Sequence, residues 1–281
     1  TLFAQDIEAY AARDQVRPKR DARVGMLPPK LAQILVNLAV GQIEQKVQSD
    51  ARLDEAQGED EQRSESYKEY GEQVVESSTQ RFAKNTGGAT GLARRQAGMA
   101  RIRVLDPFCG TGVILQEALL MGYHVVGTDI DPRMVDYAKG NIRWLVEKYP
   151  WIESQVVIEV ADATRWRWPR FSAVASELYL GRPLGILPQP DKLKEIVRDV
   201  NTITKKFLAN LGAQLKVGQS LALAVPAWKT ENGYVHLPVI DRLTDMGYNR
   251  RSFVHVKNDE LIYFRQDQVV ARELLILERR E

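Results

Sequence analysis

The sequence predicts an α/β protein in which helices cover both faces of a mostly parallel, twisted sheet. Two observations predict this class. From about residue 100 onward, short runs rich in Val, Ile, Leu and Ala alternate with helical segments. The runs are apolar throughout instead of alternating with polar residues, as expected for parallel strands buried on both faces.

The expected elements follow in order along the chain. Strands are expected near residues 102–105, 124–128, 156–160, 172–176 and 219–225, where β-branched and other apolar residues gather. Helices near 112–121, 132–147 and 191–211 fill the connections between them. After residue 236 we expect one more helix and then β-like runs at 251–256, 261–264 and 270–277.

The chain divides into three zones. Residues 1–43 form an N-terminal segment with a helix over 29–43, because Pro28 and Pro29 precede leucines and an isoleucine at helical spacing. Residues 44–98 are rich in Gln, Glu, Ser, Asp and Arg, and they bury too little apolar area to offset the entropy of ordering. We therefore expect a flexible linker there, with a helical piece near 66–84. Residues 99–281 form the core.

Composition narrows the class of protein. The formal net charge is only +2, so any nucleic-acid surface must be a local patch. The single cysteine, Cys109, excludes an intramolecular disulfide framework and is typical of a cytoplasmic protein. No apolar run approaches the roughly 18 residues of a membrane span, and the first residues carry no signal-peptide pattern. Three histidines, one cysteine and no ligand spacing leave no metal site to predict.

A glycine-rich turn follows the first predicted strand, in the segment Asp106-Pro-Phe-Cys-Gly-Thr-Gly112. Gly110 and Gly112 allow a tight turn and a close approach of the backbone to a ligand. The helix that opens behind the turn offers unpaired N–H groups to a carboxylate. A dinucleotide site would show GxGxxG here. The acid at the strand end and the Pro-Phe insertion instead favour the amine and carboxylate of an amino-acid moiety.

The second and third strands also end in acids. Asp129 falls where an acid accepts hydrogen bonds from ribose hydroxyls, and Ile130 is placed to lie against an adenine face. Asp162 follows the third strand, where it is placed to accept from the adenine amino group. A single aspartate at a strand end is more often a helix N-cap. Acids after three successive strands favour a nucleoside site at the carboxyl edge of the sheet.

Three segments resemble the family of RNA methylases that modify guanine N2 in tRNA: DPFCGTG, GTDIDPRM and RPKRDARVGMLPPKLAQILVNLA. The resemblance covers nearly the whole chain outside 44–98, and the closing YFRQDQVVARELLIL is similar to the family's C-terminal hairpin. It implies a class I, Rossmann-like methyltransferase fold, an α/β sheet that ends in an antiparallel C-terminal hairpin, with S-adenosyl-L-methionine as cofactor. It also implies a cofactor pocket lined by Met26, Pro28, Asp106, Pro107, Phe108, Cys109, Gly110, Thr111, Gly112, Asp129, Ile130, Asp131, Asp162 and Ala163.

The fourth strand leads into the position where amino-directed methyltransferases carry an Asp or Asn, two prolines and an aromatic residue. Oxygen acceptors there take the N–H protons of an exocyclic amine, while the aromatic ring stacks on the base. This chain instead has Ser176-Glu-Leu-Tyr-Leu-Gly181. Glu177 takes the acid position and Tyr179 can supply the ring, but the prolines are missing. Three interpretations stay open: the same reaction in altered geometry, a different amine substrate, or cofactor binding without turnover.

Basic residues are candidates for substrate contact. A run before Met26 and the segment RWRWPR after Asp162 combine positive charge with aromatic rings, which suits phosphate contact and base stacking. The alternative is that the charges are solvated, that Asp14 and Asp21 pair the arginines, and that Trp166 and Trp168 pack on the sheet. The predicted substrate contacts are Arg17, Lys19, Arg20, Arg23, Trp166 and Arg167.

These patterns predict a methyltransferase acting on an exocyclic amine of a nucleic-acid base, with guanine N2 in tRNA or other RNA as the first hypothesis. The base would have to be unstacked to reach the cofactor. Members of the family usually carry a separate RNA-binding domain ahead of the catalytic one, and we find no counterpart of it in these residues. Two alternatives remain: a DNA adenine or cytosine amino-methyltransferase, and a noncatalytic cofactor-binding module that acts through a protein partner.

Overall fold

The computed structural model describes residues 7–21, 27–56, 102–152, 154–266 and 268–280. The chain divides into two compact units. One unit consists of Thr1–Val40 together with Ile102–Glu281, and the other is Gly41–Arg101. The candidate site lies entirely in the first unit, so the description below concerns that unit.

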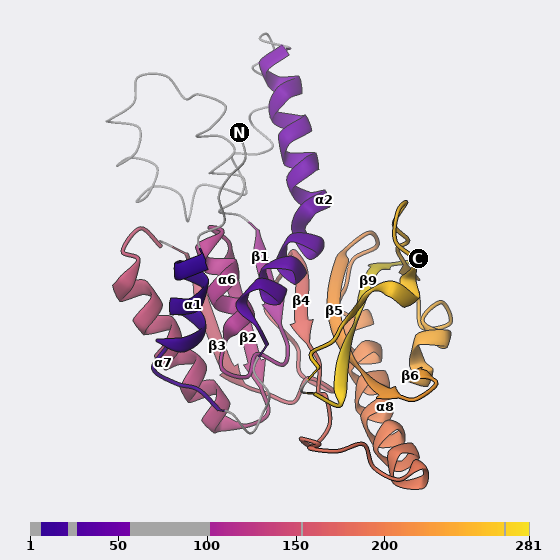
Figure 1. Ribbon diagram of the computed structural model, residues 1–281. Helices are drawn as coiled ribbons and strands as arrows, with labels where there is room; N and C mark the ends of the chain where they lie inside the picture. The colour runs from indigo at the N-terminus through magenta and orange to yellow at the C-terminus, as the bar shows by residue number, and fades with distance from the viewer. Residues whose placement is uncertain (1–6, 22–26, 57–101, 153, 267, 281) are drawn as a thin grey trace. The chain divides into compact units, whose positions relative to one another are not determined.

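Within the described residues, one sheet of nine strands forms the centre of the first unit, with seven of them in the order β3-β2-β1-β4-β5-β9-β7 (Figure 1). The first five strands of this order are parallel, and β9 is antiparallel to both β5 and β7. The strands are β1 (Arg103–Asp106), β2 (His124–Asp129), β3 (Val156–Val160), β4 (Ala173–Glu177), β5 (Ser220–Thr230), β6 (Gly233–Val235), β7 (Tyr248–Arg250), β8 (Ile262–Tyr263) and β9 (Val270–Arg279). The predicted fold class, a mostly parallel sheet with an antiparallel C-terminal end, is confirmed.

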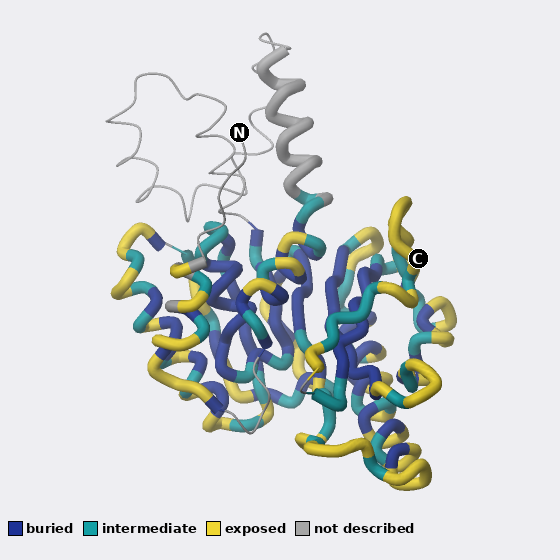
Figure 2. The backbone as a smooth tube through the Cα atoms, in the orientation of Figure 1, coloured by how far each residue is buried: buried dark blue, intermediate teal, exposed yellow. Residues whose placement is uncertain are grey.

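Helices connect the parallel strands. They are α6 (Val113–Leu120), α7 (Pro132–Lys148) and α8 (Pro190–Gly212). The chain moves one way across the sheet from β1 to β3 and the other way from β4 to β5. Because such crossovers are right-handed, α6 and α7 cover one face and α8 covers the other. The central strands are accordingly buried on both faces (Figure 2).

The sequence of α8 explains how it packs. It begins at a proline, and apolar residues recur three or four positions apart along one face. These residues share one buried cluster with side chains of β1, β4, β5 and β9. The members from α8 are Leu193, Val197, Val200, Phe207, Leu208 and Leu211.

The N-terminal segment contributes α1 (Ile7–Gln15) and the start of α2 (Pro29–Ala56). Leu31, Leu35 and Ala39 lie four residues apart and are buried, which confirms the helix expected from residue 29. The helix does not end at residue 43 as predicted. It continues to Ala56 because the residues that follow include Glu, Gln, Lys, Ala and Arg, which are good helix formers even without an apolar face. The helical piece predicted near 66–84 lies outside the described residues.

The C-terminal part differs most from the prediction. The helix expected after residue 236 is a short 3₁₀ helix, η2 (Pro238–Arg242), and a second, η3 (Asn258–Glu260), follows later. The strand expected at 251–256 is wrong: these residues are an irregular, mostly exposed segment, and the edge strand β7 precedes them. The runs near 261–264 and 270–277 are confirmed as β8 and β9. None of the helices in the described part of the chain is long and apolar enough to cross a membrane.

Candidate functional site

The turn after β1 has a backbone that requires glycine. Gly110 and Gly112 have φ angles of 49° and 83°, in the left-handed region that other residues rarely adopt. A Cβ atom on Gly112 would lie 3.2 Å from the side chain of Ala138 in α7, so glycine also permits the close approach of that helix. A Cβ atom on Gly110 would meet no atom within 4 Å. The turn therefore leaves open space beside its first glycine.

Asp106 ends β1 as a buried carboxylic acid. Its Oδ1 accepts a hydrogen bond from the Ser176 hydroxyl at 2.6 Å and from the Phe108 N–H at 3.3 Å. Burial raises the pKa of Asp106 to about 8, although both hydrogen bonds oppose the shift and the charges of Asp129 and Glu177 add to it. Asp106 is thus a buried acid that a cationic ligand group would drive toward its ionised form.

Asp129 ends β2 and faces the same turn. Its Oδ2 accepts from the Gly110 N–H at 2.9 Å, and its Oδ1 accepts from the Asp131 N–H at 3.0 Å. Burial raises the pKa of Asp129 and these hydrogen bonds oppose the rise. Each carboxylate oxygen keeps a second lone pair for a ligand. Ile130 follows with 68% of its surface exposed, which is unusual for a large apolar residue beside buried strands.

Asp131 and Asp162 each have a local structural role. Asp131 is the N-cap of α7, and its side chain accepts from the Arg133 N–H at 2.8 Å. Asp162 accepts from both the N–H and the hydroxyl of Thr164, and these bonds lower the pKa of its carboxyl. Its other oxygen lies 3.1 Å from the guanidinium of Arg165. The alternative that a strand-end aspartate is a helix N-cap therefore holds for Asp131. Asp162 lies just after the end of β3, as expected.

The remaining residues of the predicted pocket are mostly buried parts of the turn. Pro107, Cys109, Thr111 and Ala163 are buried, and burial raises the pKa of the Cys109 thiol well above its ordinary value. Phe108 packs edge-on against a phenylalanine of α8, with ring centroids 5.0 Å apart. These side chains shape the turn, and their backbone is what a ligand could touch. Pro28 is half-buried, and Met26 lies outside the described residues.

Glu177 lies at the end of β4, as the sequence predicted for the candidate catalytic acid, but it has a partner that the sequence analysis missed. The guanidinium of Arg272, on β9, donates from Nε to its Oε1 at 2.8 Å. The two side chains are 15% and 3% exposed. Burial raises the pKa of Glu177, and Arg272 opposes that rise. Ala224 of β5 lies between the two strands in register, and its short side chain leaves room for the arginine to reach across.

The residues after Glu177 take the place of the double-proline turn. The Leu178 side chain is 2% exposed, and its N–H donates to the Ala224 carbonyl at 2.9 Å, so the backbone continues the β4–β5 ladder by one step. Tyr179 is 40% exposed beside this strand end. An exposed ring next to the candidate acid is consistent with the predicted stacking role.

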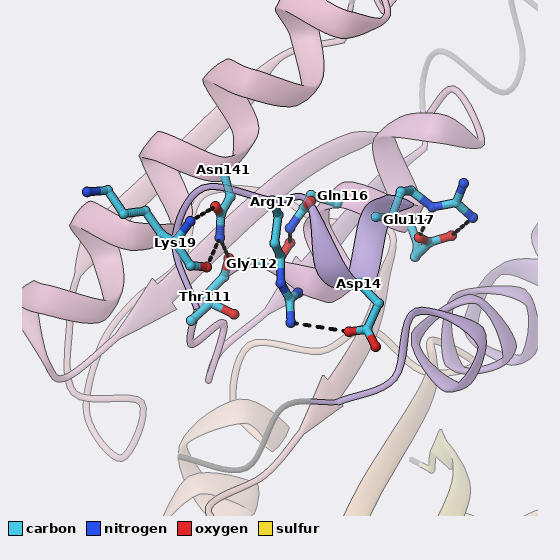
Figure 3. A network of polar contacts seen from close by, with 9 residues as sticks. Asp14, Arg17, Lys19, Thr111, Gly112, Gln116, Glu117 and Asn141 are labelled. Carbon is cyan, nitrogen blue, oxygen red and sulfur yellow. Dashed lines mark hydrogen bonds and ion pairs between the residues drawn. The ribbon is translucent and has the colours of Figure 1, made fainter. Parts of the chain in front are cut away.

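The N-terminal segment is held against the glycine turn by buried polar contacts (Figure 3). The Asn141 amide, in α7, donates to the carbonyls of Lys19 and Thr111, both at 2.9 Å, and its Oδ1 accepts from the Lys19 N–H at 2.9 Å. Arg13 of α1 pairs with Glu117 of α6 at 2.7 Å, and both side chains are buried. Lys19, in the basic run ahead of Met26, is therefore linked to the glycine turn through Asn141.

The same segment corrects one predicted substrate contact. Arg17 has no exposed side-chain surface, lies 3.7 Å from Asp14, and has its pKa lowered by burial. The prediction that it contacts substrate is wrong, because its guanidinium belongs to the interior (Figure 3). Lys19 and Arg20 are exposed, and Arg23 lies outside the described residues. Asp21 pairs with Arg133 at 3.2 Å.

The two tryptophans of RWRWPR have different environments. Trp168 is buried, and its indole N–H donates to the Thr128 hydroxyl at 3.0 Å, so the packing reading holds for it. Trp166 is 37% exposed, and Arg167 beside it is also exposed. Both residues thus remain accessible for the substrate contact that the sequence suggested.

Residues that make these contacts but were not predicted include Asn141, Ser176 and Arg272. Asn141 lies in an ordinary amphipathic helix, and nothing in its neighbourhood marks it. Ser176 stood next to the predicted acid but was assigned no role. Arg272 had a signal, because Arg272-Glu273 is a charged pair within residues 270–277, which are otherwise apolar. Charged residues in a buried strand are rarely left without partners, so this pair could have been expected to find them.

These observations fit the amino-acid and nucleoside parts of S-adenosylmethionine. Three features lie at one edge of the sheet. There is open space beside Gly110, Ile130 is exposed after the end of β2, and the Asp129 carboxylate keeps lone pairs that could accept hydrogen bonds from a ligand. Among the described residues, no three His, Cys, Asp or Glu side chains are placed to hold a metal ion.

Comparisons with known proteins agree with this geometry. Residues 104–205 match the family model described as a methyltransferase domain. A tRNA (guanine(10)-N2)-dimethyltransferase of Methanothermobacter thermautotrophicus is 63% identical over 41 residues, which are 15% of this chain and 12% of that protein. The protein of the same name from Methanocaldococcus jannaschii is 40% identical over 76 residues, 26% of this chain and 20% of that protein. The matches thus span about a fifth or less of the relatives' lengths.

Among solved structures, that of TrmN from Thermus thermophilus aligns with a TM-score of 0.41 and 21% identity, covering 70% of this chain and 51% of that one. The sheet order and the matched domain agree on the class I methyltransferase fold. Over part of its length the chain is similar to proteins named tRNA (guanine(10)-N2)-dimethyltransferases, and residues 104–205 match the methyltransferase-domain family.

Proposed function

We propose that this methyltransferase acts on the exocyclic amine of a nucleic-acid base, and specifically on guanine N2 in tRNA or another structured RNA. The observation that carries the proposal is Glu177 at the tip of β4, where a carboxylate would accept an N–H of the target amine. The partial similarity to relatives named tRNA (guanine(10)-N2)-dimethyltransferases supports the choice of base and polymer.

In the proposed site, separate residues would bind the cofactor and orient the substrate. The turn from Asp106 to Gly112 and the Asp129 carboxylate would hold the cofactor, with Asp162 and Ile130 at its adenine. Glu177 would orient the amine, and Tyr179 would stack on the base. The chemistry that the cofactor supplies is transfer of its methyl group, and the protein contributes positioning and a dry environment.

A second candidate is a noncatalytic cofactor-binding module. One observation favours it: Arg272 already occupies one oxygen of Glu177, and Leu178 stands where amino-directed enzymes carry proline. In that case the pocket would bind the cofactor without transferring its methyl group.

One experiment separates these candidates. The chain is incubated with S-adenosylmethionine carrying a radiolabelled methyl group and with separate pools of tRNA, ribosomal RNA and DNA, and the labelled product is digested to nucleosides. The proposal requires label in an RNA pool as N2-methylated guanosine, and its loss in Glu177→Ala. Label in DNA alone would identify a DNA amino-methyltransferase. Cofactor binding by calorimetry with no label in any pool would favour the noncatalytic module.

A further inference from the structure

A cluster of aromatic and basic side chains lies at the carboxyl edge of the sheet, away from the cofactor turn. We name it the hairpin patch: Lys229 of β5, Tyr234 of β6, His236 just after β6, and Phe264 just after β8. None of these residues belongs to the site described above. We propose that the hairpin patch is a contact surface for the RNA strand next to the target nucleotide, an inference that rests on the proposed function.

Strand registers put the patch at the same edge of the sheet as Glu177, beyond the end of β4. Glu177 is in register with Ala224 of β5, and Lys229 lies five positions further along that strand. At ~3.3 Å per residue, this carries Lys229 about 16 Å past the level of Glu177. Tyr234 pairs with Lys229 across the hairpin. Since parallel strands end at the same edge, a nucleic acid with one base at Glu177 would pass within reach of the hairpin.

Contacts within the patch hold its rings in place. The Lys229 ammonium lies 4.2 Å from the centroid of the Phe264 ring. The ring of Tyr234 is 6.3 Å from that of Phe264 at 70° and 6.5 Å from that of His236. Two aromatic rings beside an exposed cation form the combination that single-stranded RNA recognition uses, with bases stacking on rings and phosphates meeting cations.

A buried carboxylate holds one side chain of the patch, His236, in position. Glu273 of β9, with 3% of its side chain exposed, accepts from Arg250 at 2.9 Å and contacts Nδ1 of His236 at 2.5 Å. Because Nδ1 is engaged, Nε2 is the nitrogen that His236 can offer to a ligand, and 40% of its side chain is exposed. The histidine is therefore oriented from the interior while it remains accessible.

Lys229 is the cation of the patch that a phosphate backbone would contact. Lys229 and His236 are exposed, and the acid beneath them is buried and already paired with Arg250. Glu231, exposed in the β5–β6 turn, is an acidic neighbour of Lys229. A phosphate backbone would gain from Lys229 and be repelled by Glu231, so removal of the two charges should act in opposite directions.

The test measures binding of a fluorescein-labelled single-stranded RNA oligonucleotide to the full chain by anisotropy over a range of salt concentrations. We expect Phe264→Ala to weaken binding about tenfold, as for loss of one stacked base. Lys229→Gln should weaken binding and reduce the slope of log affinity against log salt by about 0.7, as for one lost phosphate contact on a single strand. Glu231→Gln should strengthen binding.

Two matched controls lie at the opposite edge of the sheet. Trp151→Ala removes a ring that is 59% exposed ahead of β3, and Lys216→Gln removes an exposed cation in the turn before β5. Both should leave RNA affinity unchanged, and no variant should alter calorimetric binding of S-adenosylhomocysteine. Equal effects of patch and control variants, or no RNA binding by the unchanged chain, would overturn the inference. Since the readout is binding, a chain that binds RNA through the patch but transfers no methyl group would contradict only the proposed function.

Discussion

At the scale of single residues, the candidate site depends on one buried ion pair. Glu177 sits at the position of an amine acceptor, and Arg272 reaches it from a strand two places away in the sheet. Burial works against the charged form of Glu177, and the guanidinium works for it. Arg272 of β9 thus offsets the cost of burying the Glu177 carboxylate in the SELYLG segment, and the residues around Glu177 in the sequence do not reveal this partner.

We expect Arg272→Met to shift the acidic limb of the kcat–pH profile to higher pH. Without the guanidinium the pKa of Glu177 rises further, so less of its carboxylate is ionised near neutrality, and activity returns as the pH is raised. Arg272→Lys keeps a cation and should shift the limb less. Unaltered profiles in the Arg272 variants would contradict this role.

Glu177→Gln should lower kcat by about 10²–10³-fold at all pH values, as for other transition-state acceptors and donors.

The raised pKa of Asp106 predicts how the free energy of unfolding depends on pH. Its pKa of about 8 in the folded chain exceeds the ordinary value of 3.8, so folding favours its protonated form. The corresponding contribution to the free energy of unfolding is complete below pH 4 and is lost as the pH rises toward 8. Asp106→Asn should therefore flatten the pH dependence of stability over this range, measured by urea unfolding.

The control for this measurement is Asp241→Asn, which changes an exposed carboxylate of η2. It should leave the slope of unfolding free energy against pH as it is in the unchanged chain. If Asp106→Asn behaves in the same way, Asp106 is ionised in the folded chain near neutrality.

At the scale of elements, the site requires the N-terminal segment to lie on the cofactor turn. Asn141 is fully buried and joins Lys19 to Thr111 through its side-chain amide. We expect Asn141→Ala to lower the free energy of unfolding by about 2–4 kcal/mol, because several buried polar groups lose their partner. Amide hydrogen exchange should become faster in residues 7–21.

The matched control is Asn249→Ala, an exposed asparagine of β7, which should change neither stability nor exchange. Unchanged exchange in residues 7–21 of the Asn141 variant would show that other contacts, such as Arg13 with Glu117, hold the segment.

The elements also show where sequence reasoning succeeds. The parallel strands and α8 were predictable because their apolar runs and spacing are determined by burial in one core. The strand ends were predictable too, so Asp106, Asp129 and Glu177 all lie where expected. The end of α2 was missed because the helix outlasts its apolar face, and 251–256 was missed because β-forming residues there have no partner strand.

The missed contacts have a common physical reason. Arg272 and Glu177 are 95 positions apart, and Asn141 and Lys19 are 122 apart. Pairing at such separations depends on strand order and helix packing, which one sequence does not specify residue by residue. The same limit applies to Arg17, whose charge suggested the surface while the fold placed it inside.

At the scale of the whole molecule, the cofactor site should be coupled to stability, because its parts come from distant segments. The N-terminal segment, the β1 turn, the end of β2 and the end of β4 meet only in the folded chain. A ligand that binds there binds no unfolded chain, so it must stabilise the fold by mass action.

S-adenosylhomocysteine at about 100 times its Kd should therefore add about 2.7 kcal/mol of stability, and raise Tm by roughly 5–10 °C for a domain of this size. Asp129→Ala should abolish most of the shift, since one of its carboxylate oxygens lies against the turn and both oxygens keep a lone pair for the ligand. Asp136→Ala, which removes an exposed carboxylate on α7, should retain the shift. A full Tm shift in the Asp129 variant would move the ribose contact elsewhere, whereas no shift in the unchanged chain would mean that the segments do not assemble a cofactor site.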